Sequence, residues 1–398
     1  MTDFLKQAQE LFPFTQALRR DFHIHPELGY REVRTAGIVA KELESLGLEV
    51  TKGVGKTGVV GLLEGGKPGP TLLIRFDMDA LPIVEDTGAE YASQNNGVMH
   101  ACGHDGHTAI GLTVAKILHA HRDQLKGTVK FVFQPAEEGL CGEDVGGAQM
   151  MMRDGVLENP KPDMALSLHL WNEKPLGWVN VAAGPIMSGA EQFSIKLTGK
   201  GGHGAAPHET IDPIVAAAQI VTALQSIVAR NVAPLETAVV SVTTIHSGEA
   251  FNVIPQEVEM KGTIRTFDLK VRERVLARFN EIVTGVANSL GCAAQIEVKR
   301  VTPATVNNAA VAAKVQETAR RILPPRTSEL DTAPYVTMGS EDMAFMLEKV
   351  DGCYFLIGSN DKERHLDYGH HHPKFDFDEQ ALVRGAGLMA TAVADILS

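Results

Sequence analysis

The feature that most constrains the fold is an alternation of short apolar runs with segments of helical periodicity. Short apolar runs, suited to strands that are covered on both faces, begin at Gly58, Thr71, Val129 and Met164. Apolar residues recur at helical spacing over residues 3–20, 31–47, 106–121 and 145–155. This alternation predicts an α/β domain whose sheet is largely covered.

The pattern changes near residue 187, where a compact insertion begins. Strand and helix patterns then follow in the order βαββαβ, over residues 192–198, 211–230, 238–246, 257–267, 269–290 and 294–301. This is the order of the ferredoxin-like unit, which can stand alone as a domain. The α/β character resumes after Val301, with an apolar strand from Cys353 and helices expected near 307–323, 340–348 and 378–396.

The length and these patterns together predict two domains. A chain of 398 residues is too long for one ordinary core, and 44% hydrophobic with 22% charged residues is the composition of a soluble globular protein. We predict a discontinuous first domain, residues 1–186 and 301–398, and an inserted second domain, residues 187–300.

Charge and cysteine usage restrict the partners and the location. The formal net charge of −12 disfavours nucleic acid and anionic membranes as partners. The cysteines lie far apart without a CxxC pair, which argues against a disulfide framework and favours a reducing compartment. The N-terminal residues lack the pattern of a signal peptide, and no apolar run has the length of a membrane span. We therefore expect a cytoplasmic protein.

The densest group of metal-binding residue types is Met99-His-Ala-Cys-Gly-His-Asp-Gly-His107, which precedes a predicted helix. Imidazole and thiolate bind zinc, manganese and similar ions, and Cys102 and His104 can face one site from a loop. The alternative is a polar turn that caps the helix, and the spacing alone leaves this open.

Two adjacent glutamates, Glu137 and Glu138, follow the apolar strand that begins at Val129. This is the edge of a sheet where α/β active sites gather. Because adjacent side chains cannot point the same way, one can bind a metal while the other holds a water, as metal-assisted hydrolysis requires. Taken alone, the pair is also compatible with a solvated charged turn.

Three further segments add candidates. His169 is expected at the end of the apolar strand from Met164, and the string His370-His-His-Pro373 returns histidines from the far end of the chain. Asp77 and Asp79 follow another strand, where carboxylates can orient metal-bound histidines. Each segment has a structural alternative. Four segments carry ligand-type residues at strand ends: the loop at 99–107, the glutamate pair, His169 and the string at 370–372. Together they favour a metal site.

These residues make the chain resemble the M20 metallopeptidase family, in its amidohydrolase branch of hippurate hydrolases and auxin-conjugate hydrolases. The resemblance extends nearly end to end. It rests on the motifs Arg20-Asp-Phe-His-Ile-His-Pro-Glu-Leu, Arg75-Phe-Asp-Met-Asp-Ala-Leu-Pro-Ile, Met99-His-Ala-Cys-Gly-His-Asp-Gly-His, Gln134-Pro-Ala-Glu-Glu-Gly, Gly199-Lys-Gly-Gly-His-Gly-Ala-Ala-Pro-His, Asn252-Val-Ile-Pro, Gly262-Thr-Ile-Arg-Thr-Phe, Gly339-Ser-Glu-Asp-Met and His371-His-Pro.

The resemblance implies a zinc-peptidase-like catalytic domain that holds two divalent metal ions, zinc or manganese first, with cobalt or nickel as alternatives. It implies as ligands Cys102, His104, Glu138, His169 and His371. It makes Glu137 the general acid/base, which takes a proton from the attacking water and delivers it to the leaving amine. The implied reaction is hydrolysis of the amide bond of N-acyl-L-amino acids.

The resemblance also implies that the inserted domain is a lid and dimerisation domain, and that the protein is a homodimer or a higher homo-oligomer. His203 matches a histidine that polarises the scissile carbonyl, often in the active site of the partner subunit. Asn252 and Arg265 match positions that bind the substrate's carboxylate, for which a guanidinium fork is suited.

Two departures from the wider family bear on the site. In the carboxypeptidase and desuccinylase branches an aspartate bridges the metals, whereas here a Cys-Gly-His arrangement replaces it, so Asp77 and Asp79 are placed in the shell around the ligands. The run after Glu138 is long, which leaves the roles of Cys141 and Glu143 open.

Three alternative functions remain at this point. They are a dipeptidase or carboxypeptidase of the same family, a thiol hydrolase with Cys102 as nucleophile, and a non-catalytic relative. The sequence specifies neither the acyl group nor the amino acid.

Overall fold

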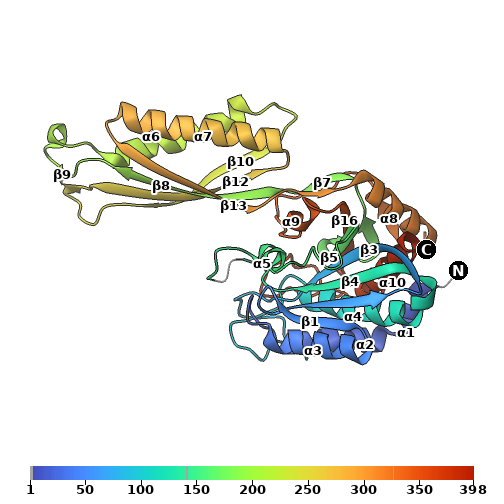
Figure 1. Cartoon of the computed structure of the whole chain (residues 1–398). Helices are drawn as coiled ribbons and strands as arrows, with labels where there is room; N and C mark the ends of the chain where they lie inside the picture. The colour runs from blue at the N-terminus through green and yellow to red at the C-terminus, as the bar shows by residue number, and fades with distance from the viewer. Residues whose placement is uncertain (1–2, 140–141, 326) are drawn as a thin grey trace. The chain divides into compact units, whose positions relative to one another are not determined.

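The structure, a computed structural model, describes residues 3–139, 142–325 and 327–398. The chain forms two compact units (Figure 1). The first comprises Met1–Ile186, Val306–Tyr335 and Asp342–Ser398, and the second comprises Met187–Thr305 and Val336–Glu341. Each unit has its own cluster of buried apolar side chains.

The first unit is built on a mixed sheet with the strand order β1-β2-β4-β3-β5-β16-β6-β15. Its strands are β1 (Glu49–Val54), β2 (Gly58–Glu64), β3 (Lys67–Asp77), β4 (Lys126–Gln134), β5 (Met164–Pro175), β6 (Trp178–Asn180), β15 (Glu329–Asp331) and β16 (Gly352–Asn360). The central strands β4, β3, β5 and β16 are parallel, so their carboxyl ends face the same edge. The short strands β7 (Gly184–Met187) and β14 (Thr305–Asn307) pair with each other.

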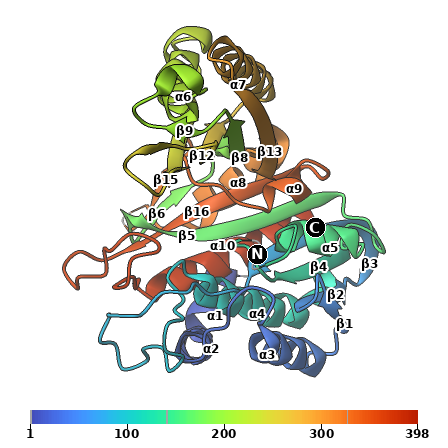
Figure 2. The same cartoon turned by 90° about the vertical axis from the view of Figure 1, so that its left-hand side faces the viewer.

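Two long apolar helices pack against this sheet. They are α4 (His104–Ala120) and α10 (Gln380–Ile396), and α1 (Phe4–Glu10), α2 (Phe12–Ile24), α3 (Val33–Ser45) and α8 (Ala309–Ile322) pack around them. Figure 2 shows α1 to α4 together on one side of the sheet. The shorter helices α5 (Gly147–Arg153) and α9 (Ala344–Leu347) contact each other, and a 3-10 turn, η1 (Arg122–Gln124), precedes β4.

The predicted elements of this unit are present, but some predicted elements differ in extent and several short strands were not predicted. The helix predicted over 3–20 is two helices, α1 and α2. The first ends at Glu10, and α2 begins with Pro13 in its first turn, where a missing N–H needs no partner. The sequence did not predict β1, a mostly exposed strand without an apolar alternation. His169 does not end its strand, because β5 continues to Pro175.

The second unit contains a four-stranded antiparallel sheet in the order β10-β12-β8-β13. Its chain order is β8 (Gly189–Thr198), α6 (Pro213–Ser226), β10 (Ala238–His246), β12 (Glu257–Thr266), α7 (Leu269–Ser289) and β13 (Ala293–Thr302), which is the predicted βαββαβ. Both helices cover one face of the sheet (Figure 1). The rings of Phe193 and Phe279, whose centroids are 4.7 Å apart, join that face to α7.

Smaller elements complete the second unit. A two-stranded sheet is formed by β9 (Gly202–His203) and β11 (Val253–Ile254), and η2 (Pro207–Glu209) follows β9. A π-helical turn, η3 (Ile227–Asn231), continues α6. Within the described ranges, Pro213–Asn231 has the length and apolar composition of a membrane span, but 33% of that window is buried and core helices of soluble proteins pass the same test.

Candidate metal centre

The five predicted ligands lie together in the first unit. Cys102 and His104 lie where α4 begins, Glu138 follows β4, His169 lies in β5 and His371 lies in the loop before α10. The ligand atoms form overlapping groups, in each of which they lie within 4.8 Å of one another. The groups are Cys102 with His104 and His169, Cys102 with Glu138 and His371, and His104 with Glu137 and Glu138.

A glycine allows the first two ligands to converge. Gly103 stands between Cys102 and His104 as the N-cap of α4, with a φ of 93°. This left-handed conformation is strained for residues with a Cβ. The chain therefore turns sharply between the thiol and the imidazole, and both side chains face the same space.

His104 and Glu138 each have one buried polar atom without a partner. His104 Nδ1 lies 3.0 Å from the carbonyl oxygen of Asp79 and 3.3 Å from its Oδ1, so this nitrogen carries the proton that is donated. His104 Nε2 and Glu138 Oε1 are buried, have no hydrogen-bond partner among the described residues and lie 4.0 Å apart. Leaving such atoms unpaired is costly unless another group binds them.

Cys102 and His169 form a second pair of facing atoms. The distance from Cys102 Sγ to His169 Nε2 is 3.5 Å. His169 Nδ1 lies 2.6 Å from the carbonyl oxygen of Leu170, which accepts its proton. This contact fixes the tautomer that leaves the Nε2 lone pair directed at the thiol.

The backbone places His371 at the same centre. Its φ is 66°, and its N–H donates to the carbonyl oxygen of Ala101 at 2.8 Å. Its Nε2 lies 3.3 Å from Glu138 Oε2, and its side chain is half-exposed. Glu138 therefore faces His104 with one carboxylate oxygen and His371 with the other.

The pKa values of these groups reflect a buried site rich in carboxylates. Burial opposes the charge on His104, but Asp77, Asp79 and Glu138 raise the pKa of its ring to about 10. Burial, with the neighbouring histidines, lowers the pKa of His169 well below its usual range, so this ring is neutral. Burial and the charge of Glu138 raise the pKa of the Cys102 thiol.

The separations fit ions held between these atoms. Zinc lies about 2.0–2.2 Å from nitrogen and oxygen ligands and about 2.3 Å from sulfur. Two ligands on one ion are then about 3.5–4 Å apart, which matches both the His104–Glu138 distance of 4.0 Å and the Cys102–His169 distance of 3.5 Å. The donor set of this chain therefore fits divalent transition metals.

His107 is close to this centre, but both of its ring nitrogens make hydrogen bonds within the protein. Its Nδ1 lies 2.6 Å from Asp77 Oδ1, and its Nε2 accepts the N–H of Leu170 at 2.9 Å. Although His107, His104 and Asp77 form a further compact group, neither nitrogen of His107 is free. Asp77 also receives the guanidinium of Arg75 at 2.6 Å, so it supports the site through hydrogen bonds.

The turn that carries Glu137 and Glu138 is fixed on several sides. The N–H of Ala136 donates to Glu32 Oε1, and the N–H of Glu138 donates to Asp79 Oδ2, each at 2.9 Å. The N–H of Asp342 points at Glu137 Oε1, at 3.4 Å. Burial and the charge of Asp79 raise the pKa of Glu32 to about 7.

The other predicted site residues belong to the second unit. His203 lies on β9, opposite Val253 on β11, and the N–H of Gly204 donates to the carbonyl oxygen of Asn252 at 2.8 Å. His203 and Asn252 are therefore close neighbours, and both are exposed. Arg265 lies on β12, donates to Ser340 Oγ at 3.3 Å and has a pKa lowered by burial.

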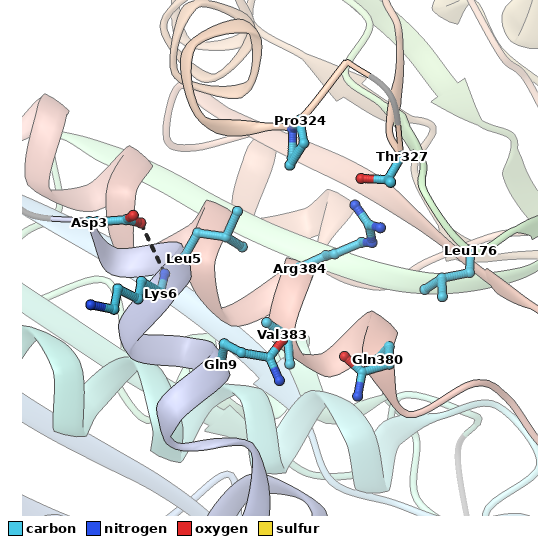
Figure 3. A pocket seen from close by; sticks show the side chains of 10 residues that line it. All are labelled: Asp3, Leu5, Lys6, Gln9, Leu176, Pro324, Thr327, Gln380, Val383 and Arg384. Carbon is cyan, nitrogen blue, oxygen red and sulfur yellow. Dashed lines mark hydrogen bonds between the residues drawn. The ribbon is translucent and has the colours of Figure 1, made fainter.

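The sequence left two residues of the long run after Glu138 without a role. Glu143 pairs with Lys56, and Cys141 lies outside the described residues. A separate pocket of about 420 Å³ lies where α1 meets α10 (Figure 3). Its lining side chains, among them Leu5 and Arg384, include no candidate site residue.

Sequence reasoning missed several residues that support the centre. Arg75 and Gln134 both donate to Asp342 Oδ1, at 3.0 Å and 2.7 Å, and the N–H of Ala148 donates to Asp342 Oδ2. Asp342 and Arg75 belong to motifs noted above, but their spacing carries no sign of this contact. Glu32 lies outside those motifs and was not singled out.

Comparison with known proteins finds a family match over most of the chain. Residues 73–395 match the description Peptidase family M20/M25/M40. The chain belongs to this family.

Members of the M20 family align with nearly the whole chain. The YhaA protein of Bacillus subtilis is 41% identical over 97% of this chain and 96% of its own length. Thermostable carboxypeptidase 1 of Saccharolobus solfataricus is 41% identical over 95% of this chain and 94% of its own length. The N-acetylcysteine deacetylase of Bacillus subtilis is 38% identical over 96% of each chain.

Solved structures of this family have the same fold. A protein of methicillin-resistant Staphylococcus aureus aligns with a TM-score of 0.93 at 35% identity, over 100% of this chain and 99% of its own. The YxeP protein of Bacillus subtilis, described as a dinuclear metal-binding peptidase from the M20 family, aligns with a TM-score of 0.83 at 34% identity, over 98% and 99%.

Proposed function

We propose that this chain is a metal-dependent amidohydrolase that cleaves the amide bond of N-acyl-L-amino acids and releases a carboxylic acid and the free amino acid. The class of acyl group includes acetyl and aryl-acyl groups. The observation that carries the proposal is the pair of bare buried atoms, His104 Nε2 and Glu138 Oε1, beside the carboxylate of Glu137. The named activity of the deacetylase relative supports the choice of substrate.

The proposed centre holds two divalent ions with Cys102, His104, Glu138, His169 and His371. Cys102, His104 and Glu138 would be the most central of these ligands, because each belongs to at least two of the compact groups. When bound, the ions lower the pKa of water toward neutrality and polarise the amide carbonyl. A thiolate beside imidazoles favours zinc, and manganese is the next candidate. The dinuclear description of the YxeP protein supports the stoichiometry.

The residues of the chain supply the proton transfers. Glu137 takes a proton from the attacking water and delivers it to the leaving nitrogen, so that the amine departs uncharged. Asp77 and Asp79 orient the histidines around the ligands. In the second unit, His203 is proposed to polarise the carbonyl, and Asn252 with Arg265 to bind the carboxylate of the amino acid.

A Glu137→Gln variant tests the mechanism. Glutamine keeps the size of the side chain but cannot accept a proton, so kcat should fall by about 10²- to 10⁴-fold. Elemental analysis should find wild-type metal content, because Glu137 is not a proposed ligand. The matched Glu143→Gln variant, which alters a carboxylate paired with Lys56, should keep wild-type kcat. Full activity of the Glu137→Gln variant would refute this role for Glu137.

A carboxypeptidase or dipeptidase is the second candidate, favoured by the carboxypeptidase relative at 41% identity. Both reactions cleave an amide beside a free carboxylate and differ in the group on the acyl side. We expect kcat/KM for acetyl- and benzoyl-amino acids to exceed that for dipeptides and N-blocked peptides. The reverse order would favour the peptidase.

A thiol hydrolase is disfavoured by the surroundings of Cys102. A nucleophilic cysteine needs a lowered pKa, whereas burial and the carboxylates raise the pKa of this thiol. Chelation separates the two cases: a metal-dependent enzyme should lose activity and regain it with added metal, and a thiol hydrolase should be unaffected.

We propose that the second unit serves as a lid and as the site of homodimerisation. β10 is an edge strand of its sheet, and α6 exposes Ile214 and Val215. Exposed apolar side chains beside a strand with one open edge favour association with a second copy. Light scattering should give a dimer mass, and Val215→Glu should weaken the dimer. A cytoplasmic location and the absence of nucleic-acid and membrane partners stay predictions from charge and composition.

A further inference from the structure

Glu32 is a buried carboxylate that contacts the catalytic turn and that the proposed function leaves without a role. It is fully buried and directly precedes α3. A residue at this position normally caps the helix with its side chain. Glu32 makes no such capping bond. Its carboxylate is directed elsewhere.

A second glutamate performs the capping instead. The carboxylate of Glu27 accepts the N–H of Arg34 at 3.0 Å and the N–H of Thr35 at 2.8 Å, which are two of the unpaired donors at the start of α3. The helix therefore has its cap without Glu32. This division of roles means that Glu32 is not required for the helix and that its burial serves another contact.

That contact is with the turn that carries Glu137. Glu32 Oε1 accepts the N–H of Ala136 at 2.9 Å, and Glu32 Oε2 accepts the hydroxyl of Thr57 at 2.5 Å. Ala136 has a φ of 47°, a left-handed conformation that is strained for a residue with a Cβ. Such strain persists only where the surroundings hold the backbone in place.

The neighbouring groups hold the turn on its other sides. The carbonyl oxygen of Ala136 accepts the N–H of Gly147 at 3.0 Å, and a Cβ on Gly147 would lie 1.6 Å from the carbonyl oxygen of Pro135. The N–H of Glu138 donates to Asp79 Oδ2 at 2.9 Å. Glu32 and Asp79 thus fix the backbone amides on the two sides of Glu137.

We propose that Glu32 is a positioning residue for the hydrolysis: through the N–H of Ala136 it holds the strained turn that presents the carboxylate of Glu137. The inference rests on the proposed function. Either protonation state of Glu32 can accept at Oε1, so the role requires an acceptor oxygen at this distance rather than a negative charge.

Four variants separate positioning from general stability. Glu32→Ala removes the acceptor, and Glu32→Asp keeps a carboxylate but shortens its reach. Glu32→Gln keeps an acceptor oxygen and can donate to Thr57. Glu27→Ala is the matched control, because it removes a carboxylate from the same segment without touching the turn. Each variant is measured for kcat, KM, metal content and amide hydrogen exchange in peptides that contain Ala136.

We expect Glu32→Ala and Glu32→Asp to lower kcat by about 10- to 100-fold with KM nearly unchanged and metal content at the wild-type level. Amide exchange at Ala136 should accelerate about tenfold, as expected for loss of one hydrogen bond. Glu32→Gln should stay within a few-fold of wild type in both measurements. Glu27→Ala should leave kcat and this exchange unchanged.

Three outcomes overturn the inference. They are wild-type kcat and exchange in Glu32→Asp, a loss of kcat that follows loss of metal, and an equal loss in Glu27→Ala. If Glu32→Ala fails to fold, the comparison of Glu32→Asp with Glu32→Gln still tests the inference. The exchange measurement needs no turnover, so it reports on Glu32 even if Glu137→Gln shows that the proposed reaction is wrong.

Discussion

The protein holds His104 and Glu138 each through one polar group. A second polar atom of each side chain has no hydrogen-bond partner among the described residues. His104 is held through Nδ1 by Asp79, and Glu138 through its backbone N–H by the same aspartate. One side chain therefore orients two proposed ligands and keeps His104 Nε2 and Glu138 Oε1 facing each other. This arrangement lowers the cost of ordering the ligands when an ion binds.

Metal binding should release protons. In the metal-free protein the pKa of His104 is about 10 and that of the Cys102 thiol is raised, so at pH 7.5 both hold a proton that an ion must displace. Affinity should therefore rise with pH, and calorimetry in two buffers of different ionisation enthalpy should detect roughly two protons released. His246→Ala, at an exposed histidine on β10, is the control. Buffer-independent heats would contradict this expectation.

Glu32 should make the metal-free protein less stable as pH rises. Its pKa in the folded state is about 7, raised by burial and by Asp79, so between about pH 4.5 and 7 the folded state keeps a proton that the unfolded state has released. The free energy of unfolding then falls with pH by at most about 1.4 kcal/mol per unit from this group. Urea unfolding of wild type and Glu32→Gln measures it. If the free energies of unfolding of the two proteins differ by the same amount from pH 5 to 7.5, the pKa of Glu32 is not raised.

At the scale of elements, a buried charge network joins three helices near the metal centre. Arg19 on α2 donates to Asp105 on α4 at 2.9 Å and to Asp376 at 2.8 Å, and it lies 3.4 Å from Glu379 at the start of α10. Asp105 directly follows His104. The network therefore fixes the first turn of α4, which carries His104 and directly follows Cys102 and Gly103.

Arg19→Met should strongly destabilise the first unit. The change removes a fully buried cation from beside Asp105 and Asp376, and breaking a buried ion pair in this way typically costs about 3–5 kcal/mol. Lys6→Ala is the control, since its pair with Glu10 is exposed and such pairs contribute little. Chemical unfolding monitored by circular dichroism measures both. Equal stability of the two variants would show that the network is compensated by other groups.

The sequence predicted the fold and the site to different depths. Apolar periodicity located the long elements, such as α4 and β12, because burial imposes it directly. It did not locate β1 or β15, which are short or exposed and therefore lack a pattern. Residue types drew attention to the segments that hold the five ligand candidates, and the family resemblance selected the candidates within them. Glu32 and Asp342 were not found, since a carboxylate that supports a turn has the same spacing as one in solvent.

At the scale of the whole molecule, each unit has a separate core, and the second is almost continuous in sequence. Its apolar cluster includes Phe193, Leu224 and Phe279, all contributed by residues 187–305. The first unit instead needs segments from both ends of the chain. The two units therefore differ in what they require in order to fold.

Residues 187–305 should fold when expressed alone. The fragment contains all strands of its sheet and both covering helices, so its apolar core is complete. We expect a cooperative thermal transition that is insensitive to chelators, because the proposed ligands lie elsewhere. The full chain should show a second transition that chelation shifts to lower temperature. A fragment that lacks cooperative unfolding would contradict the independence of this core.

The place of β16 between β5 and β6 has a consequence for biosynthesis. Its residues, 352–360, and His371 leave the ribosome after the whole second unit, whereas β5 precedes that unit. Since domains fold as units during translation, the second unit can fold first while β5 waits with an unpaired edge. Loading of the proposed centre must then wait until His371 has emerged, and the nascent chain passes through a stage in which an open strand edge is available to chaperones.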